Sequence, residues 1–243
     1  MANHPIQEKR LGSCSRNNAV SSRFSPWLTP LVYFLGRHFV IPFYFREVKI
    51  SGQEHIPAQG PVIFAPTHRS RWDALLLPYA AGRHISGRDL RFMVTADEVK
   101  GVQGWFIRRL GGFAVNVHRP SIATLRHGVE LLQQGEMMVI FPEGGIFRGD
   151  SVRSLKPGLA RMALQAEAST TCLEVKILPV SLHYSHPCPH WGTDVEIKIG
   201  APIKVADYTG VETKVGARYL TQTLHDALSG LLTQAKQLVA LAS

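Results

Sequence analysis

The sequence predicts an α/β fold, a two-layer or three-layer sandwich with a largely parallel mixed sheet and an N-terminal interfacial helical segment. Two observations predict it. Short apolar runs typical of buried strands alternate along the chain with runs that carry apolar residues at helical spacing. The alternation continues without an internal repeat or linker, so the 243 residues are expected to hold one sizeable domain and an appendage.

The first 45 residues are expected to lie outside that domain as two segments. Residues 1–25 are polar with scattered Lys and Arg, which is typical of a flexible N-terminal tail. Residues 26–45 are the most apolar and aromatic part of the chain, but Arg37, His38 and Pro42 interrupt them. They therefore fall short of the roughly 20 uncharged residues of a spanning helix. We expect a helix or broken helical hairpin in a membrane interface; the alternative is a helix packed over the sheet.

The predicted strands share a short apolar or alternating run, and they lie at 46–51, 61–66, 90–95, 111–117, 137–141, 173–183 and 195–199. The predicted helices share an apolar stripe. One begins near residue 72, and the others cover 96–110, 121–134, 157–168 and 215–243. Proline lacks an amide hydrogen, so Pro78 is expected to bend or end the first helix. Ser121 is expected to cap the third helix and Gly135 to end it. The stripe of the last helix is formed by Leu220, Leu224, Leu228, Leu231, Ala235 and Leu238.

The apolar run 61–66 leads into a histidine that is followed five residues later by a carboxylate. The run is typical of a buried strand and Asp73 of the start of a helix, so His68 is expected on the loop between them. That loop can fold back until Asp73 reaches one imidazole nitrogen, which leaves the other nitrogen as a proton acceptor. The alternative is that Asp73 caps the helix and His68 is an ordinary loop histidine.

Reactive residues also follow two other predicted strands. His118 and Arg119 follow one, and the segment 142–145 with Arg148 follows another. Ligands of an open α/β sheet bind beyond the carboxyl ends of its strands, so these loops are expected to line one cleft with His68. Arg119 offers a planar, permanently charged fork for phosphate oxygens, and the glycines after residue 143 let backbone N–H groups approach an anion. The alternatives are a solvated arginine and a simple turn.

The formal charge of +9 and a pI of about 9.7 favour a negatively charged partner. Nucleic acid, an anionic membrane, a phosphorylated substrate and an acidic carrier protein all satisfy this. Nucleic acid is the least expected of them, because the basic residues are dispersed and no nucleic-acid-binding motif is present. Three cysteines without regular spacing favour a reducing compartment.

Two further classes of site are less expected. A serine hydrolase is disfavoured because the sequence contains no Gly-x-Ser-x-Gly elbow. A metal site is suggested by His183, His186, Cys188 and His190, which crowd into eight residues. Zinc ligands usually come from two separated arms, whereas this is one stretch stiffened by prolines, so we expect a polar loop and no metal.

Four short motifs, taken in order, resemble one known family. His68 and Asp73 form a His-x4-Asp box, and Gly112-Phe113 with Arg119 is similar to a spaced Gly-x-x-Phe-x-x-Arg box. A Phe-Pro-Glu-Gly box at 141–144 and a proline-containing strand segment at 178–180 follow. This order resembles the glycerolipid acyltransferases typified by 1-acylglycerol-3-phosphate acyltransferase. The resemblance covers about residues 46 to 205.

The resemblance implies an acyltransferase domain at 46–243 that moves a fatty acyl group from an acyl-carrier-protein or acyl-CoA thioester to a lysophospholipid hydroxyl. The implied acceptor is 1-acyl-sn-glycerol-3-phosphate and the product phosphatidic acid. His68, oriented by Asp73, would be the general base. The implied substrate-binding residues are Arg119, Glu143, Gly144, Gly145, Arg148 and Lys156. No cofactor is implied besides the acyl donor, and the further partner is an anionic membrane surface, bound peripherally or monotopically at the cytoplasmic face.

The chain departs from the family pattern at three places. Thr67 replaces the asparagine that usually precedes the histidine. Gly145 and Ile146 replace the usual threonine and arginine, and Arg148 comes two positions late. These positions are where the family holds the acceptor phosphate, so a different lysolipid or lipid alcohol is the alternative acceptor. A non-catalytic lipid-binding relative is the other alternative, although the intact His68 and Asp73 weigh against it.

Overall fold

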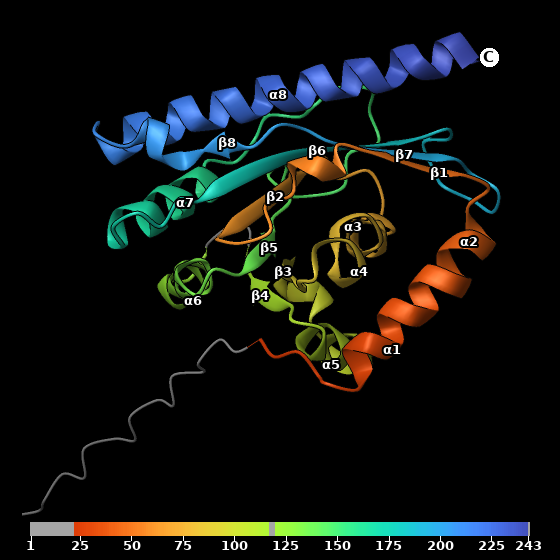
Figure 1. Ribbon diagram of the computed structural model, residues 1–243, viewed down its shortest axis with the longest axis horizontal. Helices are drawn as coiled ribbons and strands as arrows, with labels where there is room; N and C mark the ends of the chain where they lie inside the picture. The colour runs from red at the N-terminus through yellow and green to blue at the C-terminus, as the bar shows by residue number, and fades with distance from the viewer. Residues whose placement is uncertain (1–21, 117–119, 243) are drawn as a thin grey trace, which may run out of the picture.

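The computed structural model describes residues 22–116 and 120–242. The described residues form an eight-stranded sheet in the order β1-β7-β6-β2-β5-β3-β4, with β8 beside β6 (Figure 1). The strands are β1 Val48–Ser51, β2 Val62–Pro66, β3 Leu90–Thr95, β4 Phe113–Val115, β5 Met137–Val139, β6 Lys176–Tyr184, β7 Val195–Ile199 and β8 Ile203–Lys204. The seven predicted strands are all present within a few residues, and only the short β8 was not predicted.

The middle of the sheet is parallel. β6, β2, β5, β3 and β4 run in one direction, whereas β7 and β8 pair with β6 in the antiparallel sense and β1 pairs with β7 in the parallel sense. The predicted largely parallel mixed sheet is therefore confirmed. Its consequence is that the carboxyl ends of five neighbouring strands meet at one edge.

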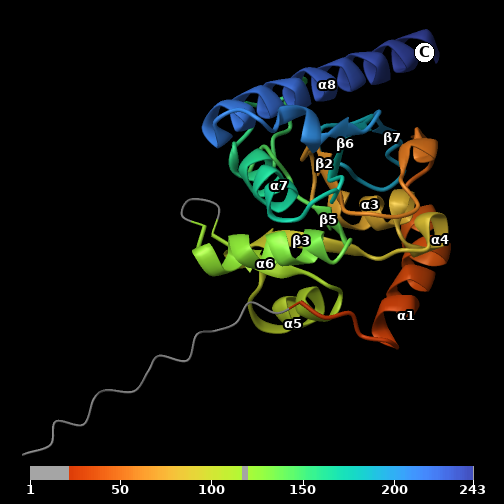
Figure 2. The ribbon, with the colours of Figure 1, turned by 60° about the vertical axis from the view of Figure 1, so that its left-hand side comes forward.

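Helices cover both faces of the sheet and make a three-layer sandwich. The helices are α1 Leu28–Leu35, α2 Ile41–Tyr44, α3 Asp73–Ala81, α4 Arg83–Ser86, α5 Gly101–Arg109, α6 Ile122–Gln133, α7 Gly158–Ser169 and α8 Thr213–Ala242. α6, α7 and α8 lie on one face, and α3 with the N-terminal helices lies on the other (Figures 1 and 2).

β2 shows why two layers of helix are needed. Its side chains alternate between the faces: Ile63 and Ala65 pack with α6, α7 and α8, while Val62 and Phe64 pack with α3 and α2. All four are 0% exposed. Burial of a side chain the size of Phe64 or Ile63 contributes about 1.5–3 kcal/mol, so both faces of this strand stabilise the fold.

Two helical details follow the prediction. The Ser121 hydroxyl accepts from the Thr124 N–H at 3.1 Å, and Gly135 takes a left-handed conformation after α6. Pro78 lies inside α3, which continues to Ala81 at the expense of one backbone hydrogen bond, so the helix ends three residues after the proline. In α8 the buried stripe continues through Leu232, which is 4% exposed, whereas the predicted stripe contained Leu231.

The helical step explains why Leu232 rather than Leu231 is buried. The buried positions of α8 advance by four residues through Leu224, Leu228 and Leu232, so position 231 falls at the edge of the stripe and is half-buried. The side chain of Leu238 lies outside the described side chains.

The N-terminal segment is one helical stretch rather than a hairpin. α1 passes through a π-helical turn, Gly36–Val40, directly into α2. One side packs on the domain, where Ile41 is 1% and Phe45 3% exposed, while Phe39 and Phe43 on the other side are 57% and 66% exposed. The segment is thus packed on the domain, as the alternative predicts, and it also exposes aromatic side chains outward; its contact with a membrane stays a prediction. No helix among the described residues has the length and apolar character needed to span a bilayer.

Most of the predicted flexible tail, residues 1–21, lies outside the described residues. Residues 22–25 differ from the prediction, because they are bound to the domain. The Ser25 N–H donates to the Arg109 carbonyl at 2.8 Å, and the buried Arg91 guanidinium lies over the Phe24 ring and donates to the Ser22 carbonyl at 3.0 Å.

Candidate active site

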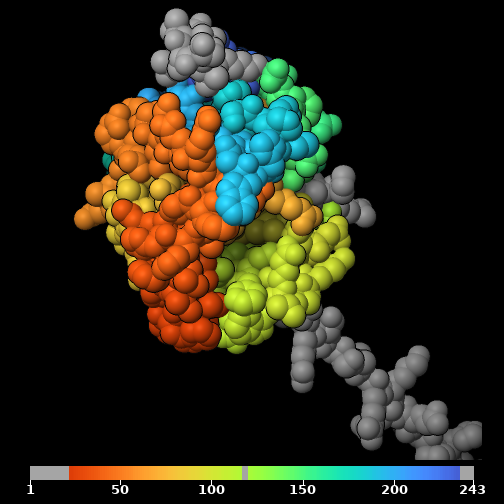
Figure 3. Space-filling view, turned by 90° about the vertical axis from the view of Figure 1, so that its right-hand side faces the viewer, coloured from red at the N-terminus to blue at the C-terminus, as the bar shows by residue number. Residues whose placement is uncertain are grey.

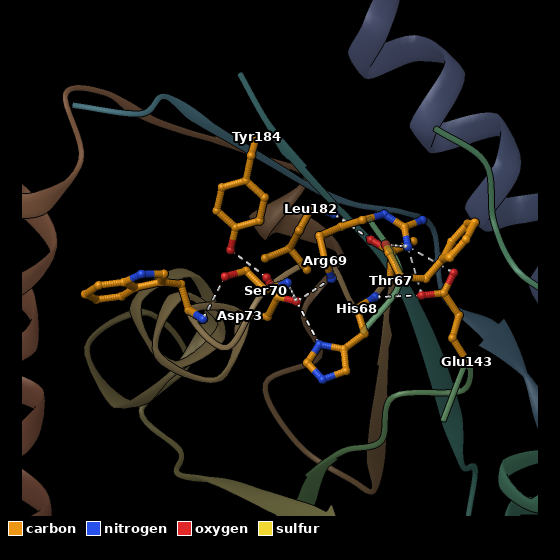
Figure 4. Close-up of polar contacts among 10 residues, drawn as sticks. Thr67, His68, Arg69, Ser70, Asp73, Glu143, Leu182 and Tyr184 are labelled. Carbon is orange, nitrogen blue, oxygen red and sulfur yellow. Dashed lines mark hydrogen bonds and ion pairs between the residues drawn. The ribbon is translucent and has the colours of Figure 1, made fainter. Parts of the chain in front are cut away.

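His68 and Asp73 face each other at the carboxyl edge of the sheet. His68 lies on the loop after β2 and Asp73 is the first residue of α3. His68 Nδ1 lies 2.9 Å from Asp73 Oδ2 (Figure 4). If Nδ1 carries the proton that is donated to the carboxylate, the neutral ring leaves Nε2 as a proton acceptor. The loop therefore folds back as its spacing predicts.

Asp73 is fully buried and both of its carboxylate oxygens accept hydrogen bonds. Oδ2 also accepts from the N–H groups of Arg69 at 2.7 Å and Ser70 at 2.9 Å, and Oδ1 accepts from the Tyr184 hydroxyl at 2.5 Å. The backbone donors precede α3, so the carboxylate closes the loop and does more than cap the helix. Its orientation toward His68 is fixed from several directions.

The Tyr184 hydroxyl remains a donor to this carboxylate. Burial, followed by the negative charge of Asp73 and the hydrogen bond to it, raises the pKa of Tyr184 far above its usual range. The phenol therefore keeps its proton across the pH range in which proteins are folded.

The His68 ring stacks on an aromatic ring and borders a cavity. Its centroid lies 3.9 Å from that of Phe141, with 26° between the ring planes. The side chain of His68 is 18% exposed, and it contributes to the wall of a cavity of about 790 Å³. The histidine is thus held on one side and accessible on the other.

The cavity is long and mostly apolar. It lies between α1, α3, β3 and α5, and Figure 3 shows the surface hollowed between the N-terminal helical segment in orange and the yellow-green segment that contains α5. β3 lines it from Leu90 to Thr95, a span of about 16 Å at roughly 3.3 Å per residue. Its volume lies within the roughly 300–1,000 Å³ of small-molecule sites.

Two polar rings in this wall are uncharged at pH 7, although the charged side chains of Arg37, Arg71 and Glu98 line the cavity as well. Burial, and then the negative charge of Asp89, raises the pKa of Tyr33 to about 12. Burial, and then the positive charge of Arg37, lowers the pKa of His84, so its ring is neutral at pH 7. Both rings line the cavity, which therefore suits an apolar ligand.

Glu143 is buried behind His68 rather than exposed to the cavity. Its carboxylate accepts from the His68 N–H at 2.9 Å, the Arg153 N–H at 3.0 Å and Arg69 Nη1 at 3.0 and 3.2 Å. The Glu143 side chain is 0% exposed. Because these protein donors occupy the carboxylate, the geometry favours a positioning role over the predicted contact with an acceptor.

The two glycines after Glu143 lie in the cavity wall. Gly144 has a φ of +73°, and a Cβ there would lie 2.6 Å from Cε of Lys156, so the lysine side chain crosses directly over this glycine. Gly145 has no other atom within 4 Å of a Cβ position. Lys156 is exposed beside the site, Arg148 is exposed further along the same loop, and Arg119 lies outside the described residues.

Three residues of the site were not predicted. Tyr184 ends β6, and its sequence neighbourhood carries no sign that it meets Asp73. Arg69 is buried, donates to Glu143 and also donates to the Phe147 and Ser151 carbonyls at 2.8 and 3.0 Å. Arg71 lines the cavity and donates to Glu98 at 2.9 Å. The one available signal was that two charged residues, Arg69 and Arg71, lie between His68 and Asp73 in the sequence.

Thr67, which stands where the resembled family usually has asparagine, makes two hydrogen bonds to β6. Its N–H donates to the Val180 carbonyl at 2.9 Å, and its hydroxyl accepts from the Leu182 N–H at 3.0 Å. The residue is fully buried. Thr67 therefore extends the pairing of β2 with β6 up to the histidine.

The histidine-rich stretch after β6 forms the loop between β6 and β7. His186 Nδ1 lies 2.8 Å from the Cys188 carbonyl oxygen, and His190 Nδ1 lies 2.9 Å from the Trp191 carbonyl oxygen. Within residues 22–116 and 120–242, no three His, Cys, Asp or Glu side chains are grouped so that they could hold a metal ion.

Comparison with known proteins agrees with this geometry. The acyltransferase family model matches residues 47–183, more than half of the chain. The mouse mitochondrial glycerol-3-phosphate acyltransferase 1 is 30% identical over 134 residues, which are 51% of this chain and 16% of that protein. The 1-acyl-sn-glycerol-3-phosphate acyltransferase of Bacillus subtilis is 23% identical over 198 residues, 79% of this chain and 91% of that protein.

A solved structure shares the fold. The 1-acyl-sn-glycerophosphate acyltransferase PlsC of Thermotoga maritima superposes with a TM-score of 0.66 and 20% identity, over 86% of this chain and 80% of that one. The sheet, the histidine and carboxylate at its edge, and the match over residues 47–183 together establish that the chain belongs to the acyltransferase family.

Proposed function

We propose that the chain transfers a fatty acyl group from a thioester to the free hydroxyl of 1-acyl-sn-glycerol-3-phosphate, giving phosphatidic acid. The observation that carries this proposal is the His68–Asp73 pair, 2.9 Å apart, at the wall of an apolar cavity of about 790 Å³. The cavity suits an acyl chain, because each buried methylene group contributes about 0.8 kcal/mol. The pair suits deprotonation of an alcohol.

His68 Nε2 takes the proton of the acceptor hydroxyl as its oxygen attacks the thioester carbonyl. The tetrahedral intermediate then collapses, the carbon–sulfur bond breaks, and the leaving thiolate takes the proton back from the imidazolium. An oxygen ester and a free thiol result, and no acyl group is bonded to the protein. Asp73 holds the ring in the required tautomer and stabilises its positive charge.

Positive groups beside the glycine turn hold the acceptor phosphate. Lys156 crosses over Gly144, and we assign Arg148 and Arg119 to the same phosphate. The backbone of Gly144 and Gly145 lets an anion approach without interference from a side chain. Glu143 acts indirectly by fixing the His68 backbone.

The acyl donor is an acyl-carrier-protein or acyl-CoA thioester. Both are acidic, and the chain has a net charge of +9. The acyl chain of the bound donor supplies the apolar surface for the cavity, and the carrier stays outside.

The N-terminal helical segment places the enzyme on an anionic membrane surface at the cytoplasmic face. Trp27, Phe34, Phe39 and Phe43 are 54% to 66% exposed on it. Exposed aromatic side chains on a packed helix, in a basic protein, are typical of a helix lying at the headgroup boundary. A membrane position would bring lipid acceptors to the cavity.

The proposal is tested with purified protein, one acyl chain length and two donors, acyl-CoA and acyl-carrier-protein. Each donor is offered 1-acyl-sn-glycerol-3-phosphate, glycerol 3-phosphate or lysophosphatidylcholine on vesicles of anionic lipid. We expect phosphatidic acid from the first acceptor. His68→Ala reduces transfer to a low residual rate, whereas the exposed His186→Ala control keeps it. Full activity of His68→Ala would disprove the assignment.

Glycerol 3-phosphate is the second candidate acceptor, and a specific observation favours it. Relatives named glycerol-3-phosphate acyltransferase match at 30% identity in mouse and at 32% over 150 residues in Pseudoalteromonas atlantica. The chain spans only 16% and 18% of these proteins. Transfer to glycerol 3-phosphate in the same panel would move the assignment to this acceptor and leave the mechanism unchanged.

A further inference from the structure

Tyr184 contacts the oxygen of Asp73 that His68 leaves unused. Its hydroxyl donates to Oδ1 at 2.5 Å, while Oδ2 faces His68 Nδ1 at 2.9 Å. In Figure 4 the Asp73 carboxylate lies between the phenol and the imidazole, so the three side chains form a chain that ends at the cavity.

The phenol is rigidly held. Tyr184 is 7% exposed, ends β6 and packs beside Phe45, with ring centroids 6.2 Å apart. β6 pairs with β2, the strand that leads to His68, over Lys176–Val180, and with β7 over Val180–Tyr184. Tyr184 therefore connects Asp73 to the sheet, whereas the other donors to Asp73 belong to the loop itself.

We propose that Tyr184 is a positioning residue for acyl transfer: its hydroxyl holds Asp73 Oδ1 so that Oδ2 stays directed at His68. The inference rests on the proposed function, because it concerns the same histidine. Tyr184 acts through the carboxylate and touches neither substrate.

The side chains around Asp73 show what removal of the phenol hydroxyl would change. In the described part of the chain, the titratable side chains bonded to Asp73 are those of His68 and Tyr184, and the nearby guanidinium of Arg69 is directed at Glu143. Loss of the hydroxyl would leave Oδ1 without its side-chain donor. The carboxylate could then rotate, and more of its negative charge would face the imidazole.

The test is Tyr184→Phe in full-length protein, assayed with the donor and acceptor that the wild type uses. We expect kcat to fall about 10- to 100-fold while KM changes by less than about twofold. The acidic limb of the kcat/KM profile should move to higher pH, because a more negative Asp73 favours the protonated imidazole. Tyr208→Phe is the matched control, since it also removes a tyrosine hydrogen bond, to Thr223 at 3.0 Å, on the opposite face of the sheet.

A double variant, Tyr184→Phe combined with His68→Ala, separates this inference from the proposed function. In a His68→Ala protein, Tyr184→Phe should cause no further loss of residual activity, because the phenol acts through that imidazole. If His68→Ala is inactive but Tyr184→Phe has wild-type kcat, the positioning role is wrong and the proposed function stands. An unmoved acidic limb, or a loss that follows a lower Tm alone, equally overturns the role of Tyr184.

Discussion

Asp73 and Glu143 are two buried carboxylates that hold the same loop from opposite sides. They follow β2 and β5, which are neighbours in the sheet. Asp73 accepts the N–H groups of Arg69 and Ser70, and Glu143 accepts the N–H of His68. The loop that carries the histidine is thereby held by two carboxylates, which follow different strands of the sheet.

The two carboxylates differ in the side chain that each one faces. Asp73 faces an imidazole, which can change its protonation state during a reaction, and Glu143 faces the guanidinium of Arg69, which cannot. The first pair borders the cavity through His68, and the second lies behind it. The comparison teaches that burial and ion pairing alone do not distinguish the two carboxylates; the partner of each one and that partner's access to the cavity do, and on this ground we propose the catalytic role for His68 with Asp73.

The largest expected effect is that of Asp73→Asn. The amide oxygen can still accept hydrogen bonds from the loop, but the neutral side chain no longer stabilises the positive charge that forms on the imidazole. We expect kcat to fall by about 1,000- to 10,000-fold with little change in Tm. Kinetics of Asp73→Asn, His68→Ala and the double variant check it, and the double variant should be no slower than the slower single one. Additive losses would show that the two residues do not act as a unit.

Glu143→Gln should give the opposite pattern. The Arg69 guanidinium, whose side chain is 8% exposed, would lose its counter-charge, so we expect a loss of about 3–5 kcal/mol in the free energy of unfolding. Activity should fall by up to about 100-fold, because the His68 backbone shifts while the catalytic groups stay. Denaturant unfolding and kcat are measured, with the exposed Glu54→Gln as control. Wild-type stability with an activity as low as that of Asp73→Asn would restore the predicted acceptor contact of Glu143.

Gly144→Ala tests the turn that follows Glu143. A side chain at a φ of +73° is strained by about 1–2 kcal/mol, and its Cβ would displace Lys156. We expect a lower Tm and a higher KM for the phosphorylated acceptor. Gly145→Ala, where the Cβ meets no protein atom within 4 Å, should leave the Tm unchanged, so a rise in KM there would report on the approach of the phosphate alone. Lys156→Gln should raise the KM alone; if it leaves KM unchanged, the lysine does not hold the acceptor phosphate.

The sequence predicted the contact of Asp73 with His68 but not the contacts of Glu143, and the reason is distance along the chain. His68 and Asp73 are five residues apart, so local spacing was enough to place their side chains together. The Tyr184 hydroxyl reaches Asp73 across 111 residues, and the Arg69 guanidinium reaches Glu143 across 74. Contacts of this range depend on strand order, which periodicity does not specify.

The same limit applied to the fold: its strands and helices were predicted, but details that depend on tertiary packing were not. Apolar runs identified the strands, and the alternation of strand and helix identified the parallel centre of the sheet. Periodicity could not show that α3 continues through Pro78, because packing of the helix against the sheet outweighs one lost hydrogen bond. It also could not show that the N-terminal segment both packs on the domain and exposes aromatic rings, since each property belongs to a different side of one helix.

The smallest expected effect concerns an exposed ion pair, which sharpens the contrast with Arg69 and Glu143. Arg46 Nε donates to Asp194 Oδ1 at 2.8 Å, with side chains 74% and 28% exposed. We expect Arg46→Gln to lower the free energy of unfolding only slightly, far less than Glu143→Gln does. At about 1 M salt, where screening acts within roughly 3 Å, this difference should vanish, whereas that of Glu143→Gln should persist.

The same pair has a defined pH dependence. The hydrogen bonds from Arg46 hold the pKa of Asp194 below its ordinary value. A carboxyl group with a lowered pKa in the folded state stabilises the protein above the pKa of the unfolded state, and this contribution is lost as the pH falls through the folded-state pKa. Unfolding curves of the wild type and Arg46→Gln should therefore differ at pH 7 and converge in acid. Lys214→Gln, at an exposed lysine in the first turn of α8, serves as the control for a simple change of net charge. A difference that stays the same in acid would show that Arg46 stabilises the fold by packing rather than by its charge.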